Sequence, residues 1–431
     1  MAASICHGAA FALLEWSARG EALGAGMVAR ADDPSAVAYN PAGITQLSGY
    51  NVQTTSTMVT VQSTVETKNV YDGSWDSNSN DREYHILPTA FITAQVSEKL
   101  FLGFGTFTRF GLGVNWDKDW PGRYSTTSAE LKCFSGNGNL AYKITDSFSV
   151  AAGIEVITAD VTLENTLDAT RIFHATGQTG ALTAMGLPTT VNDPSTNLLD
   201  VKHHLKGDAT ETAYNLALHY KPSDRISMGV SYRSRVTFKA DGRATFDKSP
   251  TVNALPLPDY LYAPTNFKSE ITVPDMLFTG IMFRPKSDLT LEFTTLWTNF
   301  SVYDKMEFVY DSPAIGVDTA TMAKNYSDTW RLGLSAEWNV KPWLALRAAY
   351  VYDESPIDEN HTDYLCLDND RNMFSFGAGY KKNRFECDIG YMYILFDDLD
   401  TNSRQTVDGF LQTNYRDADA HILGMNISYT F

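Results

Sequence analysis

The pattern that most constrains this chain is an alternation of apolar and polar side chains with a period of two, from Tyr50 to Phe431. The sequence contains no run of eighteen apolar residues, which excludes a membrane-spanning helix. A barrel strand crosses a bilayer with only ~10 residues, of which every second one is apolar. In the final segment, Leu423, Met425 and Ile427 face one way and the residues between them face the other. Each alternating segment is therefore a candidate membrane strand.

Short and long connections between these segments alternate along the chain. The short ones are 97–99, 145–147, 222–224, 285–287, 341–342 and 381–383. The long ones centre on 69–82, 112–124, 167–205, 242–269, 311–327, 354–370 and 397–418. Short turns at one end and long loops at the other are typical of an up-and-down outer-membrane barrel, and this series predicts about fourteen strands.

The two faces of the strands support a barrel in a membrane. Around Trp330, the positions of Trp330, Leu334 and Trp338 share one face, and Arg331 and Glu337 lie on the other. Tryptophan at both ends of an apolar face is typical of the aromatic girdles of such barrels. A water-soluble sandwich also alternates, but it rarely places Arg and Glu opposite Leu and Trp while keeping all turns at one end tight. We therefore predict an all-β chain whose residues 50–431 form a transmembrane antiparallel barrel.

Residues 10–49 are rich in Ala and Gly and show no such alternation. Asp32–Ser35 is typical of a helix start, and Asn40-Pro41-Ala42-Gly43 of a stop and a turn. A segment this short cannot bury a core of its own, so we expect it to form a small helical hatch that plugs the barrel lumen. Residues 1–9 are interpreted as a signal-peptide remnant or a disordered start.

Composition argues against several other functions. The formal net charge of −17 disfavours a nucleic-acid partner. The four cysteines (Cys6, Cys133, Cys366 and Cys387) have no metal-ligand spacing, and their disulfide state cannot be assigned from sequence. The eight histidines accompany no recognisable nucleophile motif, so we expect neither an enzyme nor a bound metal or cofactor.

The third predicted strand, 100–110, is unusual because glycine weakens strand pairing and marks bends or bulges. The residues concerned are Gly103, Gly105, Phe110, Gly111, Leu112 and Gly113. One interpretation is that the strand glycines face a crowded plug. The other is an inward kink that opens a gap in the barrel wall.

Two stretches of the chain carry a family resemblance. Residues 17–43 (SARGEALGAGMVARADDPSAVAYNPAG) resemble the N-terminal hatch of the FadL-type (OMPP1/FadL/TodX) outer-membrane transporters of long-chain fatty acids and other hydrophobic compounds. Residues 106–124 (TFTRFGLGVNWDKDWPGRY) are similar to the kinked third strand and second loop of that family. The strand that ends at Phe431 resembles the terminal signal that the barrel assembly machinery recognises.

The resemblance implies a route for the cargo. A groove among the extracellular loops 167–205 and 242–269 collects it, and a lumen pocket beside the hatch receives it. It then leaves sideways through the kinked strand into the Gram-negative outer membrane. We expect a monomer surrounded by outer-membrane lipid and lipopolysaccharide.

The candidate residues follow from this route. The predicted hatch latch is Asn40, Pro41 and Ala42, and the predicted kink consists of the third-strand residues named above. The substrate-binding candidates are Phe11, Leu13, Arg109, Arg233, Arg331, Arg347, Leu255, Leu257 and Leu261. The arginines fall on the inward face of their strands, where a guanidinium would suit a cargo carboxylate. Alternatively, they form salt bridges in the lumen with Glu155, Glu292, Glu337 or Glu386.

Two alternatives of function stay open. An aromatic-hydrocarbon channel of the same family would share the hatch and the third strand, and the sequence does not decide between the two cargoes. A weakly selective porin would show the same alternation, but it would not need a plug before its first strand.

Overall fold

The computed structural model describes residues 10–431 apart from 70–72, 194, 358–360, 367 and 402–409. Its 21 strands form one sheet, which closes because β1 pairs with β3 on one side and with β21 on the other. Seven wall crossings are each made of two strands: β2 with β3, β4 with β5, β9 with β10, β11 with β12, β13 with β14, β15 with β16, and β19 with β20. The result is a 14-stranded antiparallel barrel, which confirms the predicted architecture.

The element bounds are as follows. The strands are β1 Tyr50–Asn69, β2 Trp75–Ser79, β3 Tyr84–Gln95, β4 Leu100–Phe107, β5 Gly111–Asn115, β6 Ser128–Lys143, β7 Phe148–Asp168, β8 Asp200–Ser223, β9 Ile226–Arg233, β10 Val236–Lys248, β11 Thr265–Val273, β12 Met276–Lys286, β13 Leu289–Thr298, β14 Lys305–Tyr310, β15 Thr319–Ala323, β16 Thr329–Lys341, β17 Leu344–Asp353, β18 Arg371–Lys382, β19 Phe385–Phe396, β20 Leu399–Thr401 and β21 Phe410–Thr430. The helices are α1 Ala18–Ala22, α2 Ala36–Tyr39, α3 Thr170–Ala175, α4 Thr179–Ala184 and α5 Pro250–Asn253, with 3-10 turns η1 Pro41–Gln46, η2 Pro121–Tyr124 and η3 Phe300–Val302.

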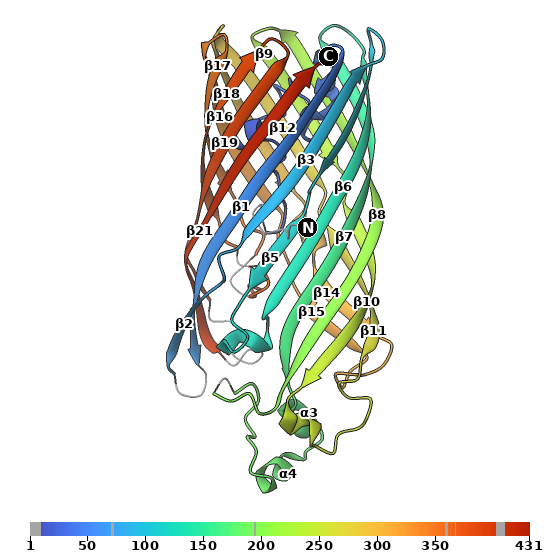
Figure 1. The fold of residues 1–431 in the computed structure, drawn as a ribbon, viewed down its shortest axis with the longest axis vertical. Coiled ribbons are helices and arrows are strands. Elements are labelled where there is room, and N and C mark those ends of the chain that lie inside the picture. Colours follow the sequence, from blue (N-terminus) through green and yellow to red (C-terminus); the bar gives the residue numbers. More distant parts are fainter. Residues whose placement is uncertain (1–9, 70–72, 194, 358–360, 367, 402–409) are drawn as a thin grey trace.

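The barrel has one end of short turns and one end of long loops (Figure 1). The C-terminus lies at the short-turn end, and α3 and α4 project beyond the wall at the other. Strands extend into both loops predicted to collect cargo, because β8 begins at Asp200 and β10 continues to Lys248. These extensions keep the alternation but place polar residues outward, for example Lys202 and Lys206, so in sequence they look like loop.

The predicted faces of the strands are confirmed around Trp330. Trp330, Leu334 and Trp338 are 48%, 58% and 49% exposed on the outer surface, whereas Arg331 and Glu337 are buried in the lumen. Cys133 and Cys387 lie within β6 and β19, and Cys6 lies outside the described residues, as does the predicted signal-peptide remnant 1–9. In the described residues, no helix is long and apolar enough to cross a membrane.

Residues 10–45 are almost all buried, and they contact the inner wall. The Glu292 carboxylate of β13 accepts hydrogen bonds from the Ala29 and Arg30 backbone N–H groups, at 2.7 and 3.1 Å. Glu337 of β16 receives guanidinium groups from both sides. It binds Arg19 Nε at 3.1 Å, Arg30 Nη1 at 3.3 Å and, from the wall, Arg347 Nε at 2.6 Å. The hatch is thus held by buried charge pairs as well as by packing.

Glu337→Ala should loosen the hatch, because it leaves three buried guanidinium groups with fewer carboxylate partners. Removing one member of a buried pair costs about 3 kcal/mol or more. We expect faster hydrogen–deuterium exchange of amides in residues 18–33 of the purified protein. Asn339→Ala, two residues along the same strand, serves as the control and should leave that exchange unchanged. Equal exchange in the two variants would show that Glu337 does not anchor the hatch.

Candidate functional site

The barrel wall is interrupted between β4 and β5. β4 pairs with β3 up to Ala90–Thr106 and with β6 up to Phe107–Ser135. Beyond the interruption, β5 pairs with β6, and no ladder joins β5 to β3 in the described part of the chain. Residues 84–89 of β3 pair with β1 on their other side only. A break in the wall therefore lies between the first half of β3 and β5.

The two strand glycines lie before this break and face the hatch. A Cβ built at Gly103 would stand 2.8 Å from the Val37 side chain, and one at Gly105 would stand 2.6 Å from Phe91. They make room for packing. The chain departs from the wall at 108–110, and Phe110, Gly111, Leu112 and Gly113 continue into β5.

The hatch provides the hydrogen bonds that β3 does not. Leu13 N donates to Arg109 O and Gly111 N donates to Phe11 O, both at 2.9 Å, so that Ala12 and Phe110 form a bridge. The Trp16 indole Nε1 donates to Thr108 O at 2.8 Å. The backbone of the interrupted strand is thereby satisfied, as a buried backbone requires.

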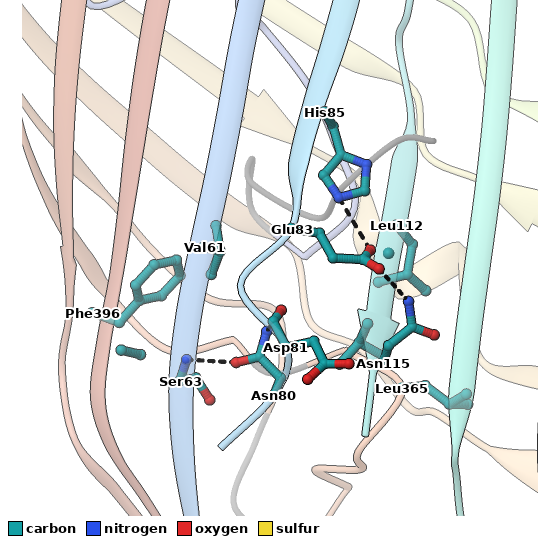
Figure 2. A pocket seen from close by; sticks show the side chains of 13 residues that line it. Val61, Ser63, Asn80, Asp81, Glu83, His85, Leu112, Asn115, Leu365 and Phe396 are labelled. Atoms are coloured by element: carbon teal, nitrogen blue, oxygen red, sulfur yellow. Dashed lines mark hydrogen bonds and ion pairs between the residues drawn. The ribbon is translucent and has the colours of Figure 1, made fainter. Parts of the chain in front are cut away.

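A cavity with both polar and apolar lining residues, here called the wall cavity, lies beside the break (Figure 2). Asn115 connects its two edges: its carbonyl accepts from Asp81 N at 3.0 Å, and its Nδ2 donates to Glu83 Oε1 at 2.9 Å. Glu83 also lies 3.3 Å from His85 Nε2. Across the break, contact is therefore made by a few polar groups near the loop end.

An apolar cavity, the central cavity, lies deeper in the lumen beside the start of the hatch and has a volume of about 60 Å³. Its lining includes Phe11, Leu112, Phe238, Tyr303, Met306 and Lys324. It shares Leu112 and Leu365 with the wall cavity. A mostly apolar lining with a few polar groups is typical of small-molecule sites.

A third space, the outer cavity, lies at the loop end, between the loop-end parts of β7 and β8 and the β14–β15 hairpin. Tyr124, Phe308 and Tyr310 contribute to its lining. It shares Leu163 and Leu365 with the central cavity. The three cavities therefore follow one another from the loops to the break in the wall.

The sequence did not predict the buried cation beside these three cavities, which is Lys324. Lys324 lines the central cavity, and its ammonium forms an ion pair with Asp363, which lines the outer cavity. Lys324 is 2% exposed. It lies in the stretch 311–327, which the sequence predicts to be a solvated loop. The sequence feature that could have indicated its burial is its position as a single lysine between Met322 and Tyr326.

All four predicted arginines lie in the lumen, and each already has an acidic partner. Arg109 and Arg233 share Glu155, at 3.5 and 3.0 Å. Arg331 lies 3.6 Å from Asp353. Arg347 lies 2.6 Å from both Glu337 and Asp388. Of these four described residues, none is among those that line the central cavity.

The other candidates are spread over the molecule. Phe11 lines the central cavity and makes edge contacts with Phe110 and Tyr303. Leu13 packs in a separate apolar cluster against the wall. Leu255, Leu257 and Leu261 belong to a cluster that packs the two collecting loops against each other, with Phe173 and Leu199 among its members.

The predicted latch residues lie in the hatch. Asn40 Nδ2 donates to Val28 O at 2.8 Å and to Leu218 O of β8 at 3.1 Å, while its Oδ1 accepts from Ala42 N. Pro41 begins η1. Asn40 thus reaches the wall at β8, away from the β4–β5 break. At the other end of the hatch, Ala10 N donates to Asp368, a loop carboxyl whose pKa is raised by burial.

Comparisons with known proteins agree over the full length. The family profile described as "Outer membrane protein transport protein (OMPP1/FadL/TodX)" matches residues 1–431. Outer membrane protein P1 of Haemophilus influenzae is 25% identical over 469 residues, which is 100% of this chain and 97% of that protein. The long-chain fatty acid transport protein of Escherichia coli K12 is 22% identical over 442 residues, or 98% of this chain and 94% of that protein.

Two solved structures share the fold. A FadL homologue of Pseudomonas aeruginosa has a TM-score of 0.83 at 18% identity, and it covers 98% of this chain and 100% of its own. The toluene transporter TbuX of Ralstonia pickettii has a TM-score of 0.70 at 16% identity, with 97% and 99% covered.

The Trp16→Phe substitution should loosen the broken strand. It removes the hydrogen bond to Thr108 O and keeps an aromatic ring in place; such a bond contributes about 1 kcal/mol. We expect amides at 108–113 to exchange roughly fivefold faster. The control is Trp120→Phe, which loses an analogous indole bond to Thr126 O across η2. If both variants exchange alike at 108–113, the hatch does not support the break.

Proposed function

Because the chain belongs to the OMPP1/FadL/TodX family of outer membrane transport proteins, we propose that it takes up long-chain fatty acids and releases them sideways through the break in its wall. The family places it in the outer membrane as a non-enzymatic transporter of hydrophobic compounds. The choice of fatty acids, the route and the residues are our proposal.

One observation supports the route above the others: the central cavity shares lining residues with the outer cavity on one side and with the wall cavity on the other. Leu365 lines all three, and Leu112, at the edge of the break, lines two of them. Cargo that enters near the loops thus has adjacent spaces up to the wall, whereas the hatch occupies the direct path through the barrel.

The physics of an oily cargo favours this path. Each methylene kept from water contributes ~0.8 kcal/mol, so a long tail gains from a dry cavity and from lipid, but not from a water-filled pore. Moving between two apolar environments needs no cofactor or energy source. A sideways exit delivers the tail to the bilayer without exposing it to the aqueous space beyond the hatch.

Lys324 is the proposed partner of the carboxylate. It is the basic side chain among those that line the central cavity. The buried Lys324–Asp363 pair already holds this ammonium at the boundary between two cavities. A cargo carboxylate at this point would take part in the charge-assisted bonds that the pair now makes.

The second candidate cargo is an aromatic hydrocarbon. Phe11, Phe238 and Met306 would suit an aromatic ring as well as an alkyl chain. Such a cargo has no charge for Lys324 to meet, so the two candidates differ in their dependence on that residue. Asn40 stays the proposed hatch latch, now with its wall partner on β8. Contact with lipopolysaccharide, assembly through Phe431 and a monomeric state stay predictions.

A reversible cross-link across the break tests the exit route. Glu83→Cys with Asn115→Cys places thiols where the two side chains now bond, and a short bis-methanethiosulfonate reagent should join them. We expect fatty-acid uptake by cells to fall after cross-linking and to recover when a reductant cleaves the bridge. Each single-cysteine variant with the same reagent is the control. Full uptake through the cross-linked protein would contradict sideways release.

Neutralising the buried pair tests the cargo class. Lys324→Met with Asp363→Asn leaves no uncompensated charge, and the loss of a charge-assisted bond should weaken fatty-acid binding roughly tenfold. Binding of the alcohol with the same chain should stay unchanged. The control is Lys305→Met with Glu307→Gln, an exposed pair on β14 at 2.8 Å. We would measure displacement of a fluorescent probe from the purified protein. An equal effect on acid and alcohol would favour the hydrocarbon candidate.

A further inference from the structure

A second apolar feature lies on the outside of the barrel, on the membrane face of β6. The sequence Ser135-Gly136-Asn137-Gly138-Asn139 places two asparagines in the lumen and two glycines outward. Outward positions of membrane strands are normally filled by apolar side chains that contact lipid. Two glycines in this row leave a depression in the side-chain layer.

The usual structural reasons for strand glycines do not apply here. Glycine in a strand weakens it and marks a bulge, a bend or a close approach by another group. β6 pairs with β7 over Ser128–Lys143 without a register shift, and with β4 over Leu100–Phe107 likewise. Neither Gly136 nor Gly138 is among the glycines with positive φ in the described chain. Close approach by another group is the reason that is left.

The protein itself does not make that approach. Among the described residues, no heavy atom lies within 4 Å of a Cβ built at Gly138. At Gly136 the nearest such atom is the tip of the Phe104 ring, at 3.9 Å. The space outside the two glycines is therefore open to whatever surrounds the barrel.

This space is a defined groove, here called the outer groove. Phe104 of β4 and Ile154 of β7 lie directly across from Gly138 in the sheet register. Leu102 and Leu140 continue its walls. The rim residues Phe104 and Ile154 are 49% and 68% exposed, so the groove is bounded by large apolar side chains.

The floor of the groove is held from the inside. Asn137, Asn139 and Asn215 donate their amide groups to one another in a closed ring, at 2.8, 2.6 and 2.8 Å. Asn137 Nδ2 also donates to Ile154 O, on the strand that forms one rim. A floor fixed in this way is already formed before any ligand arrives, which lowers the entropic cost of binding.

The groove lies on the same strands as the break in the wall, a few residues away from it. Phe104 precedes the end of β4 by three residues, and the break begins where β4 ends at Phe107. β6 borders both, since it pairs with β4 beside the groove and with β5 beside the break. A chain that emerges between β3 and β5 therefore meets this groove on the membrane face of the same wall.

We propose that the outer groove binds the hydrocarbon tail of the cargo as it leaves the break, as an exit site on the membrane face. This inference rests on the proposed function. The lining is apolar and bears no charge, so the groove selects an alkyl chain, and the headgroup stays at the polar edge of the break. Occupancy by the tail draws the cargo out of the wall before it diffuses into the bilayer.

Photo-cross-linking of the full-length protein in lipid vesicles tests the exit site. The probe is hexadecanoic acid with a diazirine at its terminal carbon, and labelled peptides are mapped by mass spectrometry. We expect labelling of Phe104, Leu140 and Ile154 above that of Phe376, an outward residue of β18. Gly136→Leu with Gly138→Leu should lower this labelling roughly fivefold by filling the space of several methylenes. Ala378→Leu, an outward change on β18, is the matched control.

The outcomes are distinct. Labelling at the groove no higher than at Phe376 in the wild-type protein overturns the exit site, and this comparison needs no variant to fold. If a diazirine phospholipid labels the groove and hexadecanoic acid does not compete with it, the occupant is a membrane lipid and the proposal is wrong. If the acid labels Met306 in the central cavity but not the groove residues, the exit site is wrong and the proposed function is unaffected. If the acid labels neither, the proposed function fails as well.

Discussion

The opening in the wall depends on the hydrogen bonds that the hatch gives to the broken third strand. A strand within the hydrocarbon layer cannot leave its N–H and C=O groups unpaired, because each such group costs several kcal/mol. At 108–111 the partners are Phe11, Leu13 and Trp16 of the hatch, in place of β3. The hatch therefore blocks the lumen and also makes an incomplete wall stable. Displacing the hatch would remove the hydrogen bonds that support the interrupted strand. The position of the hatch and the structure of the break are therefore coupled.

A single guanidinium connects this break to two others. Arg109 Nη2 donates to Ser234 O at 3.0 Å and to Pro274 O at 3.3 Å. Ser234 follows β9 and Pro274 precedes β12, so each lies where a wall crossing is interrupted. The Arg109 charge is balanced by Glu155, which also pairs with Arg233, and Arg233 in turn binds Ala38 O at the end of α2. The interruptions of three crossings thus meet at one buried network around the hatch.

Much of the fold was predictable because barrel strands encode their faces locally. A period of two is visible in a single strand, and the turn lengths order the strands without knowledge of any contact. The segment before Tyr50 could be assigned to the lumen because it lacked that pattern. The loop bounds near β8 and β10 were less accurate, since strands above the bilayer are polar outward, as at Lys202, and resemble loops.

The partners of lumen charges could not be predicted in this way. Whether an inward arginine meets an acid or a ligand depends on which strands and which hatch residues lie beside it, and these contacts span long stretches of sequence. Arg347 of β17 illustrates this, since its partner Glu337 lies on the neighbouring strand β16 and its partner Asp388 lies on β19, two strands away. Lys324 was missed for the opposite reason. Its burial depends on the β14–β15 hairpin, and nothing in its neighbours' polarity distinguishes it from a solvated loop lysine.

The length of β8 bears on where this molecule meets its surroundings. Its 24 residues extend about 80 Å along the strand at ~3.3 Å per residue, and even at a tilt near ~40° they rise well above an apolar band of ~25 Å. The extended strands therefore hold the loop helices α3 and α4 above the membrane surface. The outer cavity, whose lining includes His203 near the start of β8, therefore lies above the bilayer and not within it.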